Sequence, residues 1–119
     1  MNLAREDLET AQLLLENQRY RACISRAYYA MYYATQALLI QHNLVSRSHK
    51  GMIQQFSQHF IKSGDLPLKM ARDLRQAYDF RQLSDYEEAA SINQKQAMQI
   101  LTTSVEFVDQ VGSFIEGID

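Results

Sequence analysis

Apolar residues recur every three or four positions in five stretches of the chain, and short polar segments separate these stretches. This spacing places apolar side chains on one face of a helix and is typical of helices that pack against one another. We predict helices over residues 2–17, 20–41, 48–63, 67–85 and 91–117. Helices joined by short turns favour an all-α fold, a single up-and-down antiparallel bundle of four to five helices in which the second and fifth are the longest.

Several predicted helix ends carry residues that favour such positions. Ser48 is the predicted N-terminal cap of the third helix, because a serine hydroxyl accepts a hydrogen bond from the first turn. Pro67 fits the first turn of the fourth helix, where a missing N–H costs no hydrogen bond. Ser84 or Asp85 is predicted to end that helix, a loop follows, and Ser91 is the predicted cap of the last helix.

The second predicted helix is expected at the centre of the bundle, because it is apolar around most of its circumference. Its alanines recur at helical spacing and allow a neighbouring helix to approach closely. We interpret its tyrosines as core or subunit-interface residues, and the alternative is a platform on which nucleic-acid bases stack. These tyrosines, four of the seven in the sequence, are Tyr28, Tyr29, Tyr32 and Tyr33.

Composition and charge narrow the class of protein. The chain has 119 residues and a net charge of −2, which predicts one domain over 1–119 and no overall attraction to nucleic acid or membrane. The N-terminal segment has scattered acids and no long apolar run, so we expect no signal peptide, no membrane span and a cytoplasmic location. Cys23 is the only cysteine, so we exclude a disulfide within the chain and expect a buried thiol.

Arg26 stands in the first turns of the second helix, where the helix dipole favours anions, so we expect it to serve a packing contact or a partner.

Arg81 is the first candidate functional residue. Arg81 and Asp85 stand four positions apart, as Arg75 and Asp79 do, so ordinary surface ion pairs are one interpretation. In the functional interpretation, the guanidinium of Arg81 presents a fork of donors to a phosphate, while the ring of Tyr86 stacks on a base. The residue pattern leaves both interpretations open.

A second candidate is the basic turn that contains His49 and Lys50 at the predicted start of the third helix. Side chains and backbone N–H groups there suit an anion, and a solvated loop is the alternative. No histidine pairs with another ligand at a metal-site spacing, so we predict neither a metal nor a cofactor. The sequence has no P-loop, no G-x-G-x-x-G and no G-x-S-x-G, which argues against NTP hydrolysis and covalent catalysis.

Four motifs, in order, resemble the HEPN domain family in its short form. They are the run SRAYYAMYYA at 25–34 with ALL at 37–39, SHKG at 48–51, Phe56 and Phe60 before KSG at 62–64, and Arg81 with Asp85 and Tyr86. The resemblance covers about residues 3–115. It implies a helical bundle that pairs through a two-fold interface into a homodimer or a higher homo-oligomer. It also implies a prokaryotic toxin–antitoxin module with a minimal nucleotidyltransferase as the partner.

The resemblance further implies a site. Catalytic members of the family are metal-independent ribonucleases that use an Arg followed a few residues later by a His, with two copies meeting at the dimer cleft. Arg81 matches that Arg, but no histidine follows His59, and Asp85 and Tyr86 stand in its place. An imidazole can serve as the base for a 2′-hydroxyl or as the acid for the leaving oxygen, and His49 would have to come from elsewhere in the bundle. In some members of the family, the partner enzyme transfers a nucleotidyl group to a tyrosine near this motif. The resemblance therefore implies that Tyr86 is also a candidate acceptor for a nucleotidyl group.

These observations support one leading hypothesis and two alternatives. The leading hypothesis is a chain that binds a nucleotide or RNA phosphate and acts with a nucleotidyltransferase partner. The alternatives are a metal-independent ribonuclease toxin with a non-standard site and a non-catalytic dimeric adaptor. The predicted catalytic residues are Arg81, Asp85 and Tyr86, and the predicted nucleotide- or phosphate-binding residues are Arg81, Tyr86, His49, Lys50, Arg26 and Tyr29.

Overall fold

The computed structural model describes residues 1–85 and 92–117, and every regular element within these ranges is a helix. The prediction of an all-α bundle is confirmed. The two longest helices are the second and the fifth, with 22 and 23 residues. In chain order the elements are α1 (Asn2–Glu16), α2 (Tyr20–Gln41), α3 (His49–Phe56), a π-helical turn η1 (Ser57–Ile61), α4 (Leu68–Ser84) and α5 (Gln94–Glu116).

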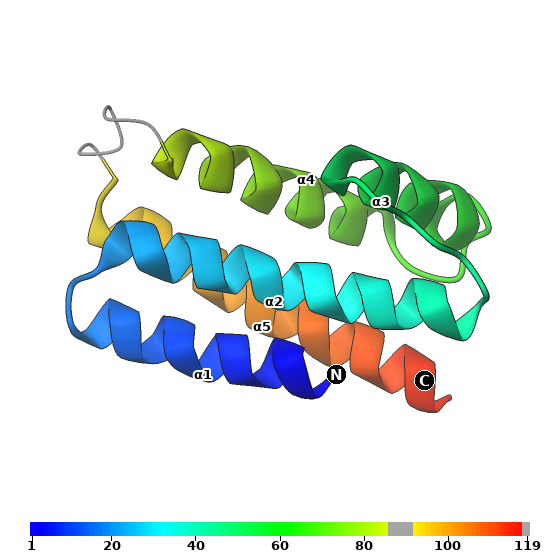
Figure 1. Ribbon diagram of the computed structural model, residues 1–119, viewed down its shortest axis with the longest axis horizontal. Helices are drawn as coiled ribbons and strands as arrows, with labels where there is room; N and C mark the ends of the chain where they lie inside the picture. The colour runs from blue at the N-terminus through cyan, green and yellow to red at the C-terminus, as the bar shows by residue number, and fades with distance from the viewer. Residues whose placement is uncertain (86–91, 118–119) are drawn as a thin grey trace.

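Helix α2 lies at the centre of the bundle, as its nearly all-round apolar surface predicts. It contacts α1, α3, α4 and α5, and the long helices run up and down alongside one another (Figure 1). Helices α1 and α5 lie on one side of α2, whereas α3 and α4 cover the other side. Residues from α2 and α4 are therefore brought together although they are far apart in the sequence.

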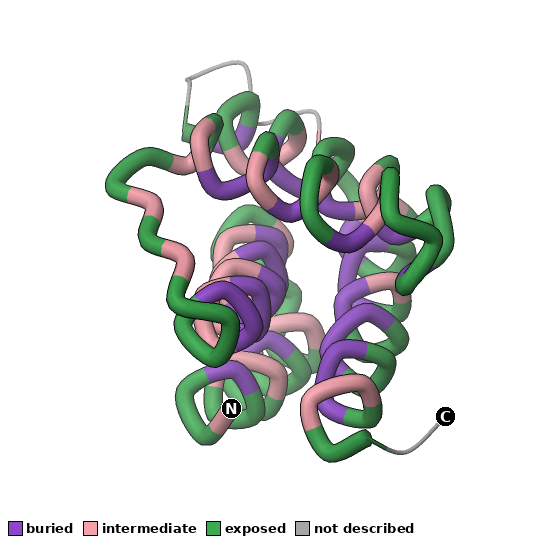
Figure 2. Tube along the Cα trace, turned by 90° about the vertical axis from the view of Figure 1, so that its right-hand side faces the viewer, coloured by how far each residue is buried: buried purple, intermediate pink, exposed green. Residues whose placement is uncertain are grey.

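The buried faces of the helices turn toward one another and form a continuous apolar core (Figure 2). Ala27, Ala30 and Ala34 of α2 are fully buried, and Ser104 of α5 donates a hydrogen bond to the carbonyl of Ala27 at 2.7 Å. Cys23 is also fully buried, as predicted, and burial raises the pKa of its thiol to about 11. The thiol is therefore protonated at neutral pH and is no nucleophile.

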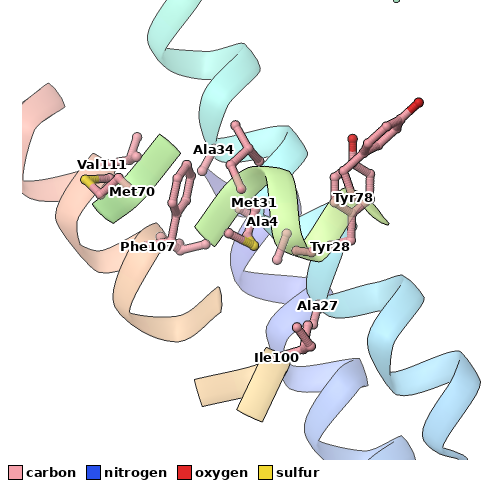
Figure 3. Packing of buried hydrophobic residues seen from close by; sticks show 14 of the residues in the cluster. Ala4, Ala27, Tyr28, Met31, Ala34, Met70, Tyr78, Ile100, Phe107 and Val111 are labelled. Atoms are coloured by element: carbon pink, nitrogen blue, oxygen red, sulfur yellow. The ribbon is translucent and has the colours of Figure 1, made fainter. Parts of the chain in front are cut away.

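Aromatic side chains connect α3 and α5 within this core. Phe107 of α5 packs against Phe56 of α3 with 5.6 Å between ring centroids, and Phe60 of η1 follows at 6.1 Å from Phe56. Figure 3 shows Phe107 among the aliphatic core residues, with Tyr28 and Tyr78 beside each other at another edge of the labelled cluster. The core thus changes from aliphatic to hydroxyl-bearing side chains where α2 meets α4.

Most helix ends agree with the predictions, with two corrections. Ser48 caps α3 and α4 ends at Ser84, both as predicted. Pro67 precedes α4 as its N-cap instead of lying in its first turn. The N-cap of α5 is Asn93, not Ser91, because the amide of Asn93 and the side chain of Gln96 form a reciprocal capping box. The predicted loop lies at 86–91, and Ser91 with it, outside the described residues.

The third predicted helix has an internal change of pitch that the periodicity did not reveal. Its α-helical part ends at Phe56 and continues as the π-helical turn η1. Both parts still point their apolar residues inward, since Phe56 and Phe60 are buried. Within the part of the chain that the structure describes, no helix is both long enough and apolar enough to cross a membrane.

Candidate functional site

The turn before α3 fixes the position of His49, the first residue of that helix. The hydroxyl of Ser48 accepts a hydrogen bond from the backbone N–H of Gly51 at 2.9 Å, and the hydroxyl of Ser46 donates to the carbonyl of Ser48 at 2.9 Å. A β-carbon on Gly51 would lie 2.8 Å from Ser48 Oγ, so a larger residue there would displace the capping hydroxyl. The start of α3, and with it His49, is therefore held by short-range hydrogen bonds.

Replacing Ser48 by alanine removes this cap. We expect Ser48→Ala to lower the free energy of unfolding by about 1 kcal/mol, because a backbone donor of the first turn loses its partner. Urea denaturation followed by circular dichroism measures the change. Ser113→Ala, at an exposed position within α5, is the matched control and should change stability by no more than about 0.5 kcal/mol. Equal stability of Ser48→Ala and the wild type would contradict the role of the cap.

Tyr28 of α2 contacts His49 directly. The hydroxyl of Tyr28 lies 2.7 Å from Nδ1 of His49, within hydrogen-bond distance. Tyr28 is fully buried, and His49 is half-buried. This hydrogen bond joins the central helix to the start of α3 and restrains the orientation of the imidazole.

Further tyrosine rings surround the imidazole and form what we call the tyrosine–histidine cluster. The rings come from two helices, α2 and α4, so the bundle topology assembles the cluster. The ring of Tyr78 is stacked on the imidazole, with 25° between the planes. The centroid distances to His49 are 4.9 Å for Tyr32, 5.6 Å for Tyr28, 5.9 Å for Tyr78 and 6.0 Å for Tyr29.

Two arginines converge on one ring of this cluster. The guanidinium carbon of Arg26 lies 4.9 Å from the centroid of the Tyr29 ring, and that of Arg81 lies 5.3 Å from it. Both distances are within the range of cation–π contacts. Arg26 comes from α2 and Arg81 from the last turn of α4, so guanidinium groups from two helices meet beside Tyr29.

The donors of Arg81 are only partly used. Its Nη2 lies 3.6 Å from Oδ2 of Asp85, which is an ion pair but too long for a good hydrogen bond. Its Nε is buried and has no hydrogen-bond partner among the described residues. A buried donor without a partner is costly, so this N–H has a hydrogen bond to offer. By contrast, Arg26 donates to Oδ1 of Asp7 at 3.1 Å.

The environment of the cluster favours neutral His49 and neutral Tyr28. Burial, and then the positive charge of Arg81, lower the pKa of His49 below its ordinary value of 6.5. Burial is also the main cause that raises the pKa of the Tyr28 hydroxyl above its ordinary value. At neutral pH the pair therefore carries no charge, and the positive charge of the site belongs to the arginines.

A cavity of about 550 Å³ lies at the start of α2, and no residue of the tyrosine–histidine cluster lines it. It is bordered by the first turns of α2 and by the end of α4, and Asp85 links it to Arg81. Arg21 on its wall donates from Nε to the carbonyl of Ser84 at 2.7 Å. The volume falls within the range of small-ligand sites. The lining residues are Gln18, Arg19, Tyr20, Arg21, Ala22, Ser25, Ser84, Asp85 and Ile92.

The structure brings together four of the predicted site residues. Arg81, Arg26, Tyr29 and His49 meet in or beside the tyrosine–histidine cluster. Asp85 is exposed and forms the predicted ion pair with Arg81. The other predicted pair, between Arg75 and Asp79, is also present, with 3.4 Å between its charged atoms. Exposed Lys50 follows His49 in the first turn of α3 and makes no ion pair within the described ranges. Tyr86 lies outside the described residues.

Three tyrosines that shape this site were not among the predicted site residues. Tyr28 and Tyr32 were considered only within the tyrosine run, as core, interface or stacking residues, and Tyr78 was not considered for the site. Tyr28 and Tyr32 are one helical turn apart, a spacing that equally suits an ordinary core face. Tyr78 is one turn before Arg81, which is a weak signal for a shared face of α4. In residues 1–85 and 92–117, no group of three or more His, Cys, Asp or Glu side chains is placed to hold a metal ion.

The sequence comparisons identify the family of this chain. A family model described as the HEPN domain matches residues 1–114, and the chain belongs to that family. The helical bundle and the four motifs of the sequence agree with this assignment.

Several curated proteins are similar over nearly the whole chain. UPF0332 protein glr0978 of Gloeobacter violaceus is 35% identical, and the match covers 97% of this chain and 92% of that protein. A protein of Methanocaldococcus jannaschii named "Putative toxin MJ0605" is 30% identical over 99% of this chain and 87% of its own length. A second protein of that organism, also with toxin in its name, is 28% identical over 94% of this chain and 76% of its own length.

Proposed function

We propose that this HEPN chain binds the phosphate groups of RNA or of a nucleotide beside Tyr29, and that it is the toxin-like component of a two-gene module. Its partner in this proposal is a nucleotidyltransferase, and the chain acts as a homodimer or a higher homo-oligomer. The family assignment and the two relatives with toxin in their names support the toxin-like role. The site supports the phosphate ligand.

The main support for the proposal is that the guanidinium of Arg81 has hydrogen-bond donors that no described residue uses. Its buried Nε lacks a partner among the described residues, and its Nη2 faces Asp85 at 3.6 Å, beyond good hydrogen-bond length. A phosphate oxygen would satisfy such a guanidinium with short, charge-assisted hydrogen bonds. The guanidinium of Arg26 also lies beside Tyr29, but its charge is offset by the ion pair with Asp7, so Arg81 is the main donor to the anion.

The tyrosines, and the cavity that Asp85 connects to Arg81, supply the remaining part of a nucleotide site. Half-buried Tyr29 and Tyr32 offer ring surface on which a base can stack, as single-stranded nucleic acids do on aromatic side chains. The cavity of about 550 Å³ at the end of α4 has room for a nucleotide unit. Arg19 and Arg21 on its wall suit a further phosphate of the same strand.

A metal-independent ribonuclease is the second candidate function, and the position of His49 is the observation that favours it. The family pattern places a histidine after the arginine, where this chain has Asp85. His49 enters from α3 instead and lies beside the Tyr29 ring that Arg81 also contacts. An imidazole at this place has the functional group that acid–base cleavage of RNA needs.

Binding and cleavage are separated by one pair of assays on the purified chain. We expect a labelled single-stranded RNA of mixed sequence to bind in the presence of a chelator, measured by fluorescence anisotropy, and to remain intact on a gel. We also expect expression of the chain alone to slow bacterial growth, and co-expression of a nucleotidyltransferase from the same module to restore it. Binding of neither RNA nor a nucleotide would contradict the proposal, and cleavage in chelator would establish the ribonuclease in its place.

A further inference from the structure

We infer that His49 donates a hydrogen bond from Nε2–H to a phosphate oxygen while its ring is neutral, and that the Tyr28 hydroxyl positions it for this role. The inference rests on the proposed phosphate site and names a further binding group within it. The geometry that carries it is the single contact of 2.7 Å between the Tyr28 hydroxyl and Nδ1.

The hydrogen-bond inventory of Tyr28 decides which nitrogen of His49 carries the proton. Tyr28 is fully buried, and Nδ1 of His49 is the only side-chain or backbone partner of its hydroxyl within the described residues. If Nδ1 carried the hydrogen and donated, the phenolic hydrogen of Tyr28 would be left without an acceptor in the core. If Tyr28 donates to Nδ1, no buried hydrogen is unsatisfied. The second arrangement places the ring hydrogen of neutral His49 on Nε2.

The charges around His49 agree with the neutral form. Burial and the nearby guanidinium of Arg81 both disfavour an imidazolium, and they lower the pKa of His49. No carboxylate of the described residues pairs with the ring. The titratable groups that face His49 are Tyr28, Tyr29 and Tyr32 on α2 and Tyr78 and Arg81 on α4, with Lys50 next to it on α3.

This tautomer has a consequence for the chemistry of the site. A nitrogen that carries a hydrogen has no lone pair with which to accept the proton of a 2′-hydroxyl, so Nε2–H can donate to phosphate but cannot act as the base. Together with the donors of Arg81, it forms a site that holds a phosphodiester without cleaving it. A buried Tyr28 hydroxyl therefore keeps this site in a binding role.

The tautomer is measured directly by nitrogen-15 shifts of the imidazole of the full chain between about pH 5 and 8.5. We expect a protonated Nε2 and an unprotonated Nδ1 at pH 7, with titration only below the ordinary value of 6.5. We expect Tyr28→Phe, which keeps the ring but removes the hydroxyl, to give a mixture of both tautomers. A dominant Nδ1–H form in the wild type would overturn the inference.

The binding role is tested with the same labelled RNA. We expect His49→Ala to weaken binding about tenfold and His49→Gln, which keeps an N–H donor, to retain most of the affinity. We expect the wild-type affinity to be level between about pH 7 and 8.5, because the neutral ring is the binding form. An affinity that falls steeply with rising pH across this range would show that the imidazolium binds and would overturn the inference.

The outcomes separate this inference from the proposed function. If Arg81→Ala loses RNA binding while His49→Ala retains it fully, the phosphate site stands and the role of His49 is wrong. If the wild type binds neither RNA nor a nucleotide, the proposed function itself is wrong, and the inference fails with it.

Discussion

Arg81→Ala is expected to weaken the binding of single-stranded RNA about ten- to hundredfold. Hydrogen bonds from a charged group contribute about 1.5–3 kcal/mol each, and every 1.4 kcal/mol corresponds to about a factor of ten in affinity. We also expect the slope of affinity against salt concentration to fall by about 0.7, the value for one lost contact with the phosphate of a single strand. Fluorescence anisotropy over a series of salt concentrations measures both quantities.

Two further variants make this prediction specific. Arg75→Ala removes an arginine from the same helix, where Arg75 pairs with Asp79 on the surface, and should leave RNA binding unchanged. Arg81→Lys keeps the charge but loses the planar fork of donors, so its affinity should be intermediate. The thermal midpoint of each variant shows whether it is folded. Equal losses for Arg75→Ala and Arg81→Ala would mean that overall charge, and not this site, holds the RNA.

Phe107→Ala is expected to cause the largest loss of stability, about 3–5 kcal/mol. Phe107 is buried in α5 and packs against Phe56 at the end of α3, so its removal leaves a cavity where these two helices meet. Total stabilities of small domains are about 5–15 kcal/mol, so this one substitution removes a large share of the stability. Urea denaturation gives the change in the free energy of unfolding.

The matched control for this cavity is Phe107→Leu, which keeps most of the apolar volume. Volume-conserving exchanges in a core cost less than about 1.5 kcal/mol, so Phe107→Leu should remain folded and should bind RNA as the wild type does. A loss below about 1 kcal/mol for Phe107→Ala would show that the surrounding side chains fill the cavity, and that Phe107 contributes little to the packing of α3 against α5.

The helices of this protein were predictable because their signals are local. The apolar periodicity placed α2 at Tyr20–Gln41, and the serine at position 48 identified the start of α3. The cap of α5 was assigned wrongly, because Ser91 and Asn93 both suit an N-cap and only the partner Gln96 distinguishes them. The π-helical turn after Phe56 keeps apolar residues on the inner face, so an apolar pattern alone does not reveal its pitch.

The candidate site was predictable only in part, because its contacts join distant segments. Arg81 was found from its neighbours in the sequence and from a family resemblance. The hydrogen bond from Tyr28 to His49 spans 21 positions, and no spacing rule connects residues on two different helices across a loop. The meeting of Arg26 with Arg81 at one tyrosine ring likewise depends on how α2 and α4 pack.

The most direct test of the phosphate site is a nuclear magnetic resonance titration of the nitrogen-15-labelled chain with single-stranded RNA in chelator. We expect saturable shifts of the Arg81 Nε–H signal and of the His49 ring nitrogens, because these are the donors assigned to phosphate. We expect little change for the Nε–H of Arg75, which pairs with Asp79. Saturable shifts at Arg75 with unchanged Arg81 and His49 signals would contradict the proposed phosphate site.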